Sequence, residues 1–208
     1  MAGFGAAFLC LALSLALPGA ARADWKGTIY IWGDSNVNTY DGTRSLQHQL
    51  QRRLPKANIK VCARGLWTLS GPPPHFKAVF PVDWIAGDLF VVQLGLNDFA
   101  THPPLEPFRA AYRDVLRDHK QRYTVICMTP IAQRNENATN RLGLRLEDYR
   151  RAIRAECNAA GASVIEGTDA FPSHPRYFKD HVHPNEAGTR RMAVWLKKEL
   201  VRLGWASE

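Results

Sequence analysis

The chain has 208 residues, enough for one sizeable domain with a buried core, and a formal net charge of +8. Its basic residues are scattered along the exposed faces of the expected helices. No zinc-finger spacing, RNP-like string or long arginine run accompanies them. We therefore expect a solvated basic surface that attracts acidic partners at long range, and no nucleic-acid site.

The N-terminus has the pattern of a secretory signal peptide. Residues 4–17 are an apolar stretch too short to span a bilayer, and the small-residue motif Ala21-Arg22-Ala23 follows it. We predict cleavage before Asp24, export to the periplasm or out of the cell, and no stable membrane span afterwards. A retained anchor is the alternative, because no Lys or Arg precedes the apolar stretch. The predicted domains are a signal peptide at 1–23 and a single domain at 24–208, whose charge is +7 once Arg22 is removed.

Strands and helices are expected to alternate along the mature chain. Short apolar runs predict the strands, and apolar residues that recur every third or fourth position predict the helices. In chain order, the expected elements are a strand at 28–32, a helix at 46–54, strands at 58–63 and 88–94, a helix at 108–119, a strand at 123–128, a helix at 146–160, a strand at 162–165, and a helix at 184–203 with Pro184 in its first turn and Gly204 as its stop.

This alternation predicts an α/β fold, a single-domain doubly wound parallel five-stranded sheet between helices, of the flavodoxin-like type. Runs such as Leu89-Phe90-Val91-Val92 lack polar alternation, as expected of strands covered on both faces. Irregular loops are expected at 67–81 and 131–143. The second could overhang a site at the carboxyl ends of the strands, and it contains Asn137-Ala138-Thr139, a glycosylation sequon that matters only in a glycosylating eukaryote.

Three cysteines, Cys62, Cys127 and Cys157, remain after cleavage. Export permits one disulfide with one thiol left over, and the sequence does not assign the pair. Three buried thiols are an equally good alternative, because all three residues fall on expected strands or on the apolar face of a helix. None belongs to a C-x-x-C pair, so neither redox catalysis nor a structural zinc site is indicated.

Two short motifs follow expected strands. Gly33-Asp34-Ser35 comes after the first strand, where the serine side chain would be exposed and its backbone N–H could face a developing oxyanion. Gly95-Leu96-Asn97-Asp98 ends the third strand, where the Asn97 amide could donate to the same oxyanion and Asp98 is expected to brace the loop. Taken singly, each motif is also ordinary turn chemistry.

A third motif, Asp180-His181-Val182-His183, precedes the last expected helix. An imidazole that acts as a base needs a carboxylate on its other nitrogen, and two side chains three residues apart on one turn can provide both groups. His183 is therefore the expected base and Asp180 its orienting partner. His181, one residue from Asp180, would tend to point elsewhere.

In order and placement, these motifs make the mature chain resemble the SGNH (GDSL-type) hydrolase family. The resemblance implies that Ser35 is the nucleophile, His183 the base and Asp180 its orienter. It also implies that the Ser35 N–H and the Asn97 amide bind the oxyanion, and that neither a metal nor an organic cofactor is needed.

The chain departs from the family pattern in two places. Asn36 stands where the family has Leu or Ile, and the block after the second strand reads Ala63-Arg64-Gly65-Leu66-Trp67-Thr68 instead of Asn-x-Gly-x-x-Gly. The third oxyanion N–H of this block would come from Gly65 or Thr68, and the sequence leaves both open.

The predicted function is that of an exported serine ester hydrolase that acts by Ser-His-Asp acyl transfer on small acyl esters, either carbohydrate O-acetyl or lipid-type esters. The basic surface favours an anionic small-molecule or glycan ester among these. The alternative is a non-catalytic glycan- or partner-binding module on a decayed hydrolase fold, because of the departures at Asn36 and Thr68. A nucleotide or phosphate binder is a poorer interpretation, since neither a G-x-G-x-x-G nor a Walker pattern occurs.

Overall fold

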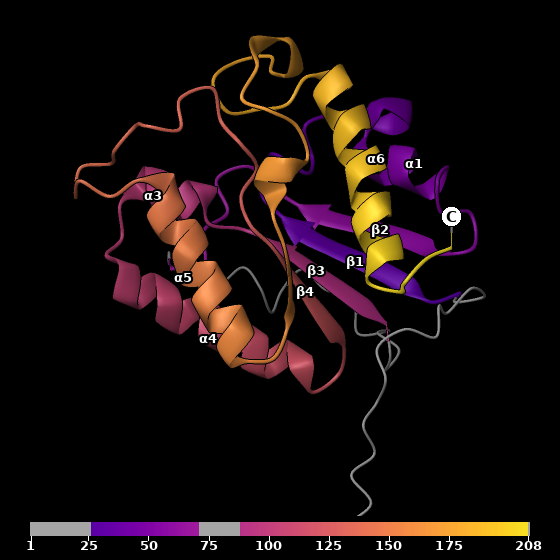
Figure 1. The fold of residues 1–208 in the computed structure, drawn as a ribbon, viewed down its shortest axis with the longest axis horizontal. Coiled ribbons are helices and arrows are strands. Elements are labelled where there is room, and N and C mark those ends of the chain that lie inside the picture. The colour runs from indigo at the N-terminus through magenta and orange to yellow at the C-terminus, as the bar shows by residue number, and fades with distance from the viewer. Residues whose placement is uncertain (1–25, 71–87, 208) are drawn as a thin grey trace, which may run out of the picture.

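The structure is a computed structural model that describes residues 26–70 and 88–207. The predicted signal peptide and most of the 67–81 loop lie outside the described residues. Five parallel strands form one sheet in the order β2-β1-β3-β4-β5 (Figure 1). Their bounds are β1 Thr28–Gly33, β2 Asn58–Ala63, β3 Leu89–Gln93, β4 Thr124–Met128 and β5 Ser163–Ile165. The doubly wound parallel sheet predicted from the sequence is thereby confirmed.

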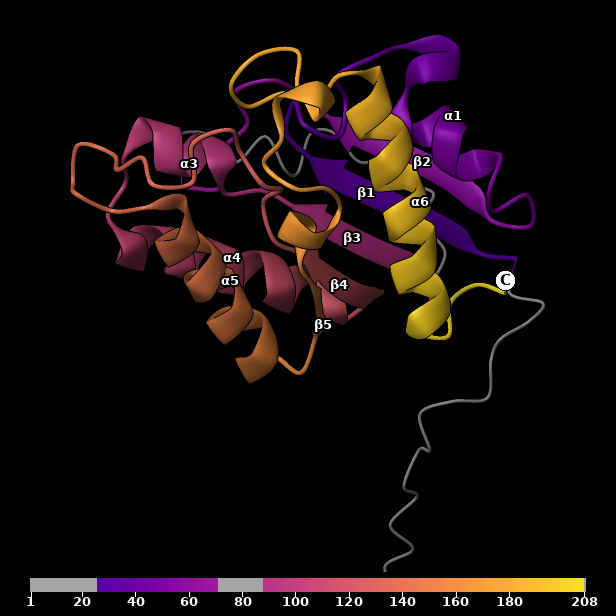
Figure 2. The same ribbon diagram turned by 45° about the horizontal axis from the view of Figure 1, so that its top comes forward.

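Two helix layers cover the sheet. Helices α1 (Leu46–Gln51) and α6 (Glu186–Arg202) pack together on one face, and α4 (Leu105–Lys120) and α5 (Leu146–Ala159) pack together on the other (Figure 2). The alternation of side chains along β1 shows the same division. Ile29 and Ile31 are buried with the α1 and α6 side chains, whereas Tyr30 and Trp32 are buried with those of α4 and α5. Strands covered on both faces explain why the sequence has continuous apolar runs.

One short helix was not expected from the sequence. Helix α3 (Leu96–Thr101) begins directly after β3, so Asn97 lies in its first turn and not in an open loop. Gly95 precedes the helix with φ 120°, and His102 ends it in the left-handed conformation. Six residues are too few to show a helical period in the sequence, which is why the pattern predicted only the end of a strand there.

The last helix starts later than Pro184, the expected first residue. Helix α6 begins at Glu186, because the Asn185 side chain accepts a hydrogen bond from the Gly188 backbone N–H and so caps the helix. Pro184 instead forms an isolated antiparallel bridge with Phe178. Gly204, the expected stop, lies just beyond the helix with φ 78°.

A disulfide joins Cys127 of β4 to Cys157 of α5, and both residues are fully buried. This pairing resolves the alternatives that the sequence left open and rules out three separate thiols. Cys62 lies on β2 at the edge of the sheet, outside this bond. No helix in the described part of the chain is long and apolar enough to cross a bilayer.

Candidate active site

The sequence motifs meet at one edge of the sheet. Ser35 follows β1 and Asn97 follows β3, and these neighbouring parallel strands end at the same edge. The chain passes from β1 to β2 on one side and returns to β3 on the other, so the strand order reverses between β1 and β3. In open α/β sheets, the carboxyl ends of strands at such a reversal flank the ligand crevice.

The turn that presents Ser35 depends on a close approach at Gly33. A Cβ atom on Gly33 would lie 2.4 Å from the Val37 side chain and 3.0 Å from the Gln93 carbonyl oxygen. Only glycine therefore allows the chain to leave β1 so tightly. The turn is closed by the Val37 N–H, which donates to the Asp34 carbonyl, and by the Thr39 hydroxyl, which donates to the Ser35 carbonyl at 2.8 Å.

The loop that carries the acid and the base is tied at its two ends. The Asn185 N–H donates to the Tyr177 carbonyl at 2.8 Å, and the Lys179 N–H donates to the His183 carbonyl at 3.0 Å. Gly188 permits this arrangement, since a Cβ atom there would lie 2.4 Å from the Tyr177 carbonyl oxygen. These hydrogen bonds thus close the loop at its base and hold it against the first turn of α6.

Three side chains form a continuous hydrogen-bonded series. The Ser35 Oγ lies 2.8 Å from Nε2 of His183, and the other ring nitrogen, Nδ1, lies 2.8 Å from Oδ2 of Asp180. The second carboxylate oxygen of Asp180 accepts from the backbone N–H groups of Val182 at 2.9 Å and His183 at 2.8 Å. The His181 ring takes no part in this series, and its carbonyl oxygen accepts from the Arg134 N–H.

The electrostatics of the turn keep Asp180 ionised. Partial burial acts to raise the pKa of Asp180, but the two backbone N–H donors and the His183 ring outweigh it and lower the pKa to about 2. A charged carboxylate therefore faces Nδ1 of His183 at neutral pH. This arrangement favours the tautomer with its proton on Nδ1, which leaves Nε2 free to accept the proton of Ser35.

Asn97 and Asp98 hold the 64–70 loop against the start of α3. The Asn97 Nδ2 donates to the Trp67 carbonyl at 3.0 Å, which uses one of its two protons. Asp98 is fully buried and accepts from the N–H groups of Leu69 and Ser70 and from the Ser70 hydroxyl at 2.6 Å. Asp98 thus braces the loop, as expected, while Asn97 keeps a second proton for another acceptor.

The candidates for the third oxyanion donor lie in this same loop. Leu69 and Ser70 already donate their N–H groups to Asp98. Among the described residues, no hydrogen-bond partner is found for the N–H groups of Gly65 or Thr68. Both candidates therefore retain an available donor, and neither is preferred by its hydrogen bonding.

Sequence reasoning missed the importance of Asp34. This residue is completely buried, and only its Oδ1 has a partner in the described part of the chain, the Asn36 N–H at 2.9 Å. Burial raises the pKa of Asp34 to about 7, with a further increase from the nearby Asp98 carboxylate, and the Asn36 N–H opposes both. The flanking glycine and serine drew attention to the motif, but nothing in the sequence indicated that Asp34 would be buried.

A hydrogen-bonded Ser–His–Asp series at the carboxyl edge of a doubly wound sheet is the arrangement found in serine hydrolases. The model of the GDSL-like lipase/acylhydrolase family matches residues 30–191, and the chain belongs to that family. It is accordingly a carboxylic ester hydrolase. No curated protein matches the sequence significantly.

Several solved structures share the fold. A member of the lipolytic G-D-S-L family from Veillonella parvula is 18% identical, with a TM-score of 0.69 and coverage of 85% of this chain and 99% of that one. An acetyl xylan esterase, AlAXEase, is 18% identical, with a TM-score of 0.68 and coverage of 83% and 99%. An active-site mutant of a family two carbohydrate esterase from Clostridium thermocellum is 20% identical, with a TM-score of 0.65 and coverage of 86% of this chain and 65% of that one.

The raised pKa of Asp34 makes stability depend on pH. The folded protein keeps the proton up to about pH 7, whereas the unfolded chain releases it near 3.8, so the free energy of unfolding falls as pH rises through this window. The side chain in Asp34→Asn cannot ionise. Relative to this variant, the free energy of unfolding of the wild-type protein should fall by on the order of 3 kcal/mol between these two pH values. Urea denaturation at a series of pH values measures the difference.

The exposed carboxylate of Asp114 on α4 provides the control for this experiment. Asp114→Asn should keep the wild-type pH dependence. Parallel pH curves for wild type and Asp34→Asn would show that folding does not raise the pKa of Asp34.

Proposed function

We propose that this ester hydrolase is an exported enzyme that transfers acyl groups through Ser35, with His183 as the general base and Asp180 as its orienting partner. The observation that carries the proposal is the pair of 2.8 Å contacts that links the Ser35 hydroxyl to the His183 ring and the ring to the Asp180 carboxylate. A serine hydroxyl is a weak nucleophile until a base takes its proton, and this geometry provides that base.

The reaction has two halves. Ser35 Oγ attacks the ester carbonyl carbon while its proton passes to Nε2 of His183, and the tetrahedral intermediate collapses as the alcohol leaves with that proton. Water then attacks the acyl-enzyme and gives one proton to His183. Collapse of the second intermediate releases the acid, and the proton returns to Ser35. This chemistry uses no metal and no organic cofactor.

The negative oxygen of each intermediate needs hydrogen-bond donors that are already in place. The Asn97 amide suits this role because one of its protons is fixed on the Trp67 carbonyl, which sets the direction of the other. The Ser35 N–H is the second proposed donor, and the N–H of Gly65 or Thr68 is the third.

The proposed substrates are small acyl esters, of the carbohydrate O-acetyl or the lipid type. The fold is shared with an acetyl xylan esterase and a carbohydrate esterase, which favours the O-acetyl carbohydrate class.

Export is supported by two features. The first 23 residues have the pattern of a signal peptide. The disulfide between Cys127 and Cys157 suits an oxidising compartment, because reducing pools keep most cytosolic thiols free. The protein recovered from the periplasm or the medium should begin at Asp24, and N-terminal sequencing that found an uncut leader would contradict export by cleavage.

Turnover of p-nitrophenyl esters of graded chain length tests the proposed chemistry. The mature protein should hydrolyse the acetyl ester fastest if the natural substrate is an O-acetyl group, whereas rates that rise with chain length would indicate a lipid-type ester. Ser35→Ala should abolish turnover because it removes the nucleophile.

Ser173→Ala changes an exposed serine in a loop and serves as the matched control. It should keep the wild-type rate. A Ser35→Ala protein that still turns over the esters would overturn the assignment of the nucleophile. A folded wild-type protein inactive on every ester would favour the binding-module alternative.

Replacement of Asn97 tests the oxyanion site. Asn97→Ala should lower kcat by about 10²- to 10³-fold with little change in KM, because the lost donor acts mainly in the transition state. Steady-state kinetics on p-nitrophenyl acetate measure both constants.

Asn97 also donates a hydrogen bond to the 64–70 loop, so the control must weaken the attachment of that loop without changing Asn97. Ser70→Ala removes the 2.6 Å hydrogen bond to Asp98 and leaves the Asn97 amide in place. It should reduce kcat far less than Asn97→Ala. Equal losses in the two variants would mean that Asn97 acts only as a brace.

A further inference from the structure

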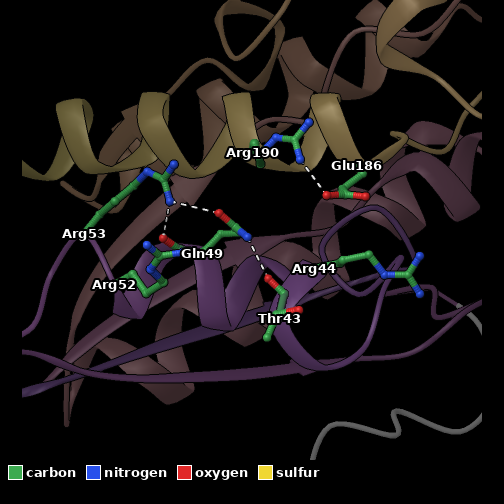
Figure 3. Close-up of a pocket in the computed structure, with 7 residues that line it drawn as sticks. All are labelled: Thr43, Arg44, Gln49, Arg52, Arg53, Glu186 and Arg190. Atoms are coloured by element: carbon green, nitrogen blue, oxygen red, sulfur yellow. Dashed lines mark hydrogen bonds and ion pairs between the residues drawn. The ribbon is translucent and has the colours of Figure 1, made fainter.

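A pocket of about 550 Å³ lies between α1 and α6, and four of its lining residues are arginines (Figure 3). Arg52 and Arg53 extend from the C-terminal end of α1, Arg190 from α6, and Arg44 from the short 3₁₀ helix at Gly42–Arg44. Glu186 is the only acidic residue among the described residues that line the pocket. The pocket therefore carries a strong excess of positive charge.

Most of this charge is not neutralised within the described part of the chain. Arg190 pairs with Glu186 at 2.5 Å, but no carboxylate lies within ion-pairing distance of the other three guanidinium groups there. Arg53 donates only to neutral oxygens of Gln49, and Arg44 lies 5.2 Å from the centre of the Tyr40 ring. Like charges gathered in one pocket repel each other, and an anion would relieve that repulsion.

Hydrogen bonds within the chain organise the pocket. The Gln49 side chain, only 8% exposed as a residue, accepts from Arg53 at 3.1 Å and donates to the Thr43 carbonyl at 2.6 Å. These bonds connect α1 to the 3₁₀ helix and fix one guanidinium group in the pocket wall (Figure 3). A planar guanidinium that is held in position matches the oxygen pairs of carboxylates, sulfates and phosphates.

The pocket belongs to the same region of the molecule as the catalytic loop. Glu186 is the first residue of α6, directly beyond the loop that carries His183, and Arg190 lies one turn further, about 6 Å along the helix axis. Tyr40 connects the two regions on the other side, since its ring lies near both Arg44 and Lys179, the residue before Asp180. Cationic groups thus extend from the catalytic loop to the pocket.

We propose that this pocket binds an anionic group of the substrate, and that the substrate is an O-acylated acidic glycan whose ester reaches Ser35 while a carboxylate of the same polymer occupies the pocket. This inference rests on the proposed function. A glycan suits the pocket better than a lipid does, because each of the described residues that line it has a polar or charged side chain.

The test uses one polymer in two charge states. O-acetylated polygalacturonate with free carboxylates and the same polymer fully methyl-esterified have the same backbone and the same acetyl groups. Acetate release from each gives kcat/KM, normalised to that for p-nitrophenyl acetate. The wild-type protein should prefer the acidic polymer by about tenfold or more, and the preference should shrink at high salt because exposed charges are screened.

The variant is Arg44→Gln/Arg52→Gln, which removes two of the charges that face no carboxylate. Its preference for the acidic polymer should fall by about three- to tenfold. Arg117→Gln/Arg151→Gln is the matched control, since these two exposed arginines lie on α4 and α5, on the opposite face of the sheet, and their removal also lowers the net charge by two units. It should keep the wild-type preference.

Several outcomes would overturn the inference. Equal acetate release from the two polymers would do so, as would an unchanged preference in the double variant. A preference for anionic over zwitterionic lysophospholipid that the double variant loses, without any preference between the two polymers, would assign the pocket to a lipid headgroup. Failure to hydrolyse p-nitrophenyl acetate would instead count against the proposed function, and the two failures are therefore distinguishable.

Discussion

The site depends on one long-range contact, the 2.8 Å approach of the Ser35 hydroxyl to the His183 ring, which joins residues 148 positions apart in the chain. The fold brings them together because β1 lies in the interior of the sheet and α6 packs over the face that also carries α1. Two glycines make the contact possible at close range. Gly33 lets the chain turn sharply after β1, and Gly188 lets the catalytic loop lie against the first turn of α6. A side chain at either position would push the His183 ring and the Ser35 hydroxyl apart.

A layer of buried polar side chains lies behind the catalytic edge. Four of these side chains are buried: Asp34, Asn36, Gln93 and Asp98. They differ in the number of hydrogen bonds that each one makes. Asp98 accepts several hydrogen bonds, whereas the side-chain amides of Asn36 and Gln93 have no partner in the part of the chain that the structure describes. The region of the proposed chemistry thus concentrates buried polar side chains, whereas the layers on either side of it are apolar.

The sequence predicted the sheet well because its signals are local. Continuous apolar runs identify buried parallel strands, and the runs at 28–32, 58–63 and 88–94 agree with the observed strands within a residue. The Asp180 to His183 turn could also be predicted, because both side chains lie on one short loop. Helix α3 is too short to show a period, and its start places Asn97 on a helix where the sequence suggested a loop.

Features that depend on packing between distant elements were not predictable. Nothing local distinguishes Cys127 and Cys157 as a pair, since their approach follows from how α5 lies on β4. The arginine pocket has the same origin. Arg52 and Arg190 belong to helices far apart in sequence, and each looks like an ordinary solvated charge until α1 packs against α6. The burial of Asp34 likewise arises only when the strands and helices close over it.

The proposed function requires above all that His183 activates Ser35 as a nucleophile. The most direct measurement is the mass of the intact protein after reaction with an alkyl fluorophosphonate, followed by mapping of the labelled peptide. We expect a single phosphonyl adduct on Ser35 that forms at least about 10³-fold more slowly in His183→Ala, because the base is lost. A folded wild-type protein that takes up no label, or that takes it up at another residue, would show that Ser35 is not the activated nucleophile.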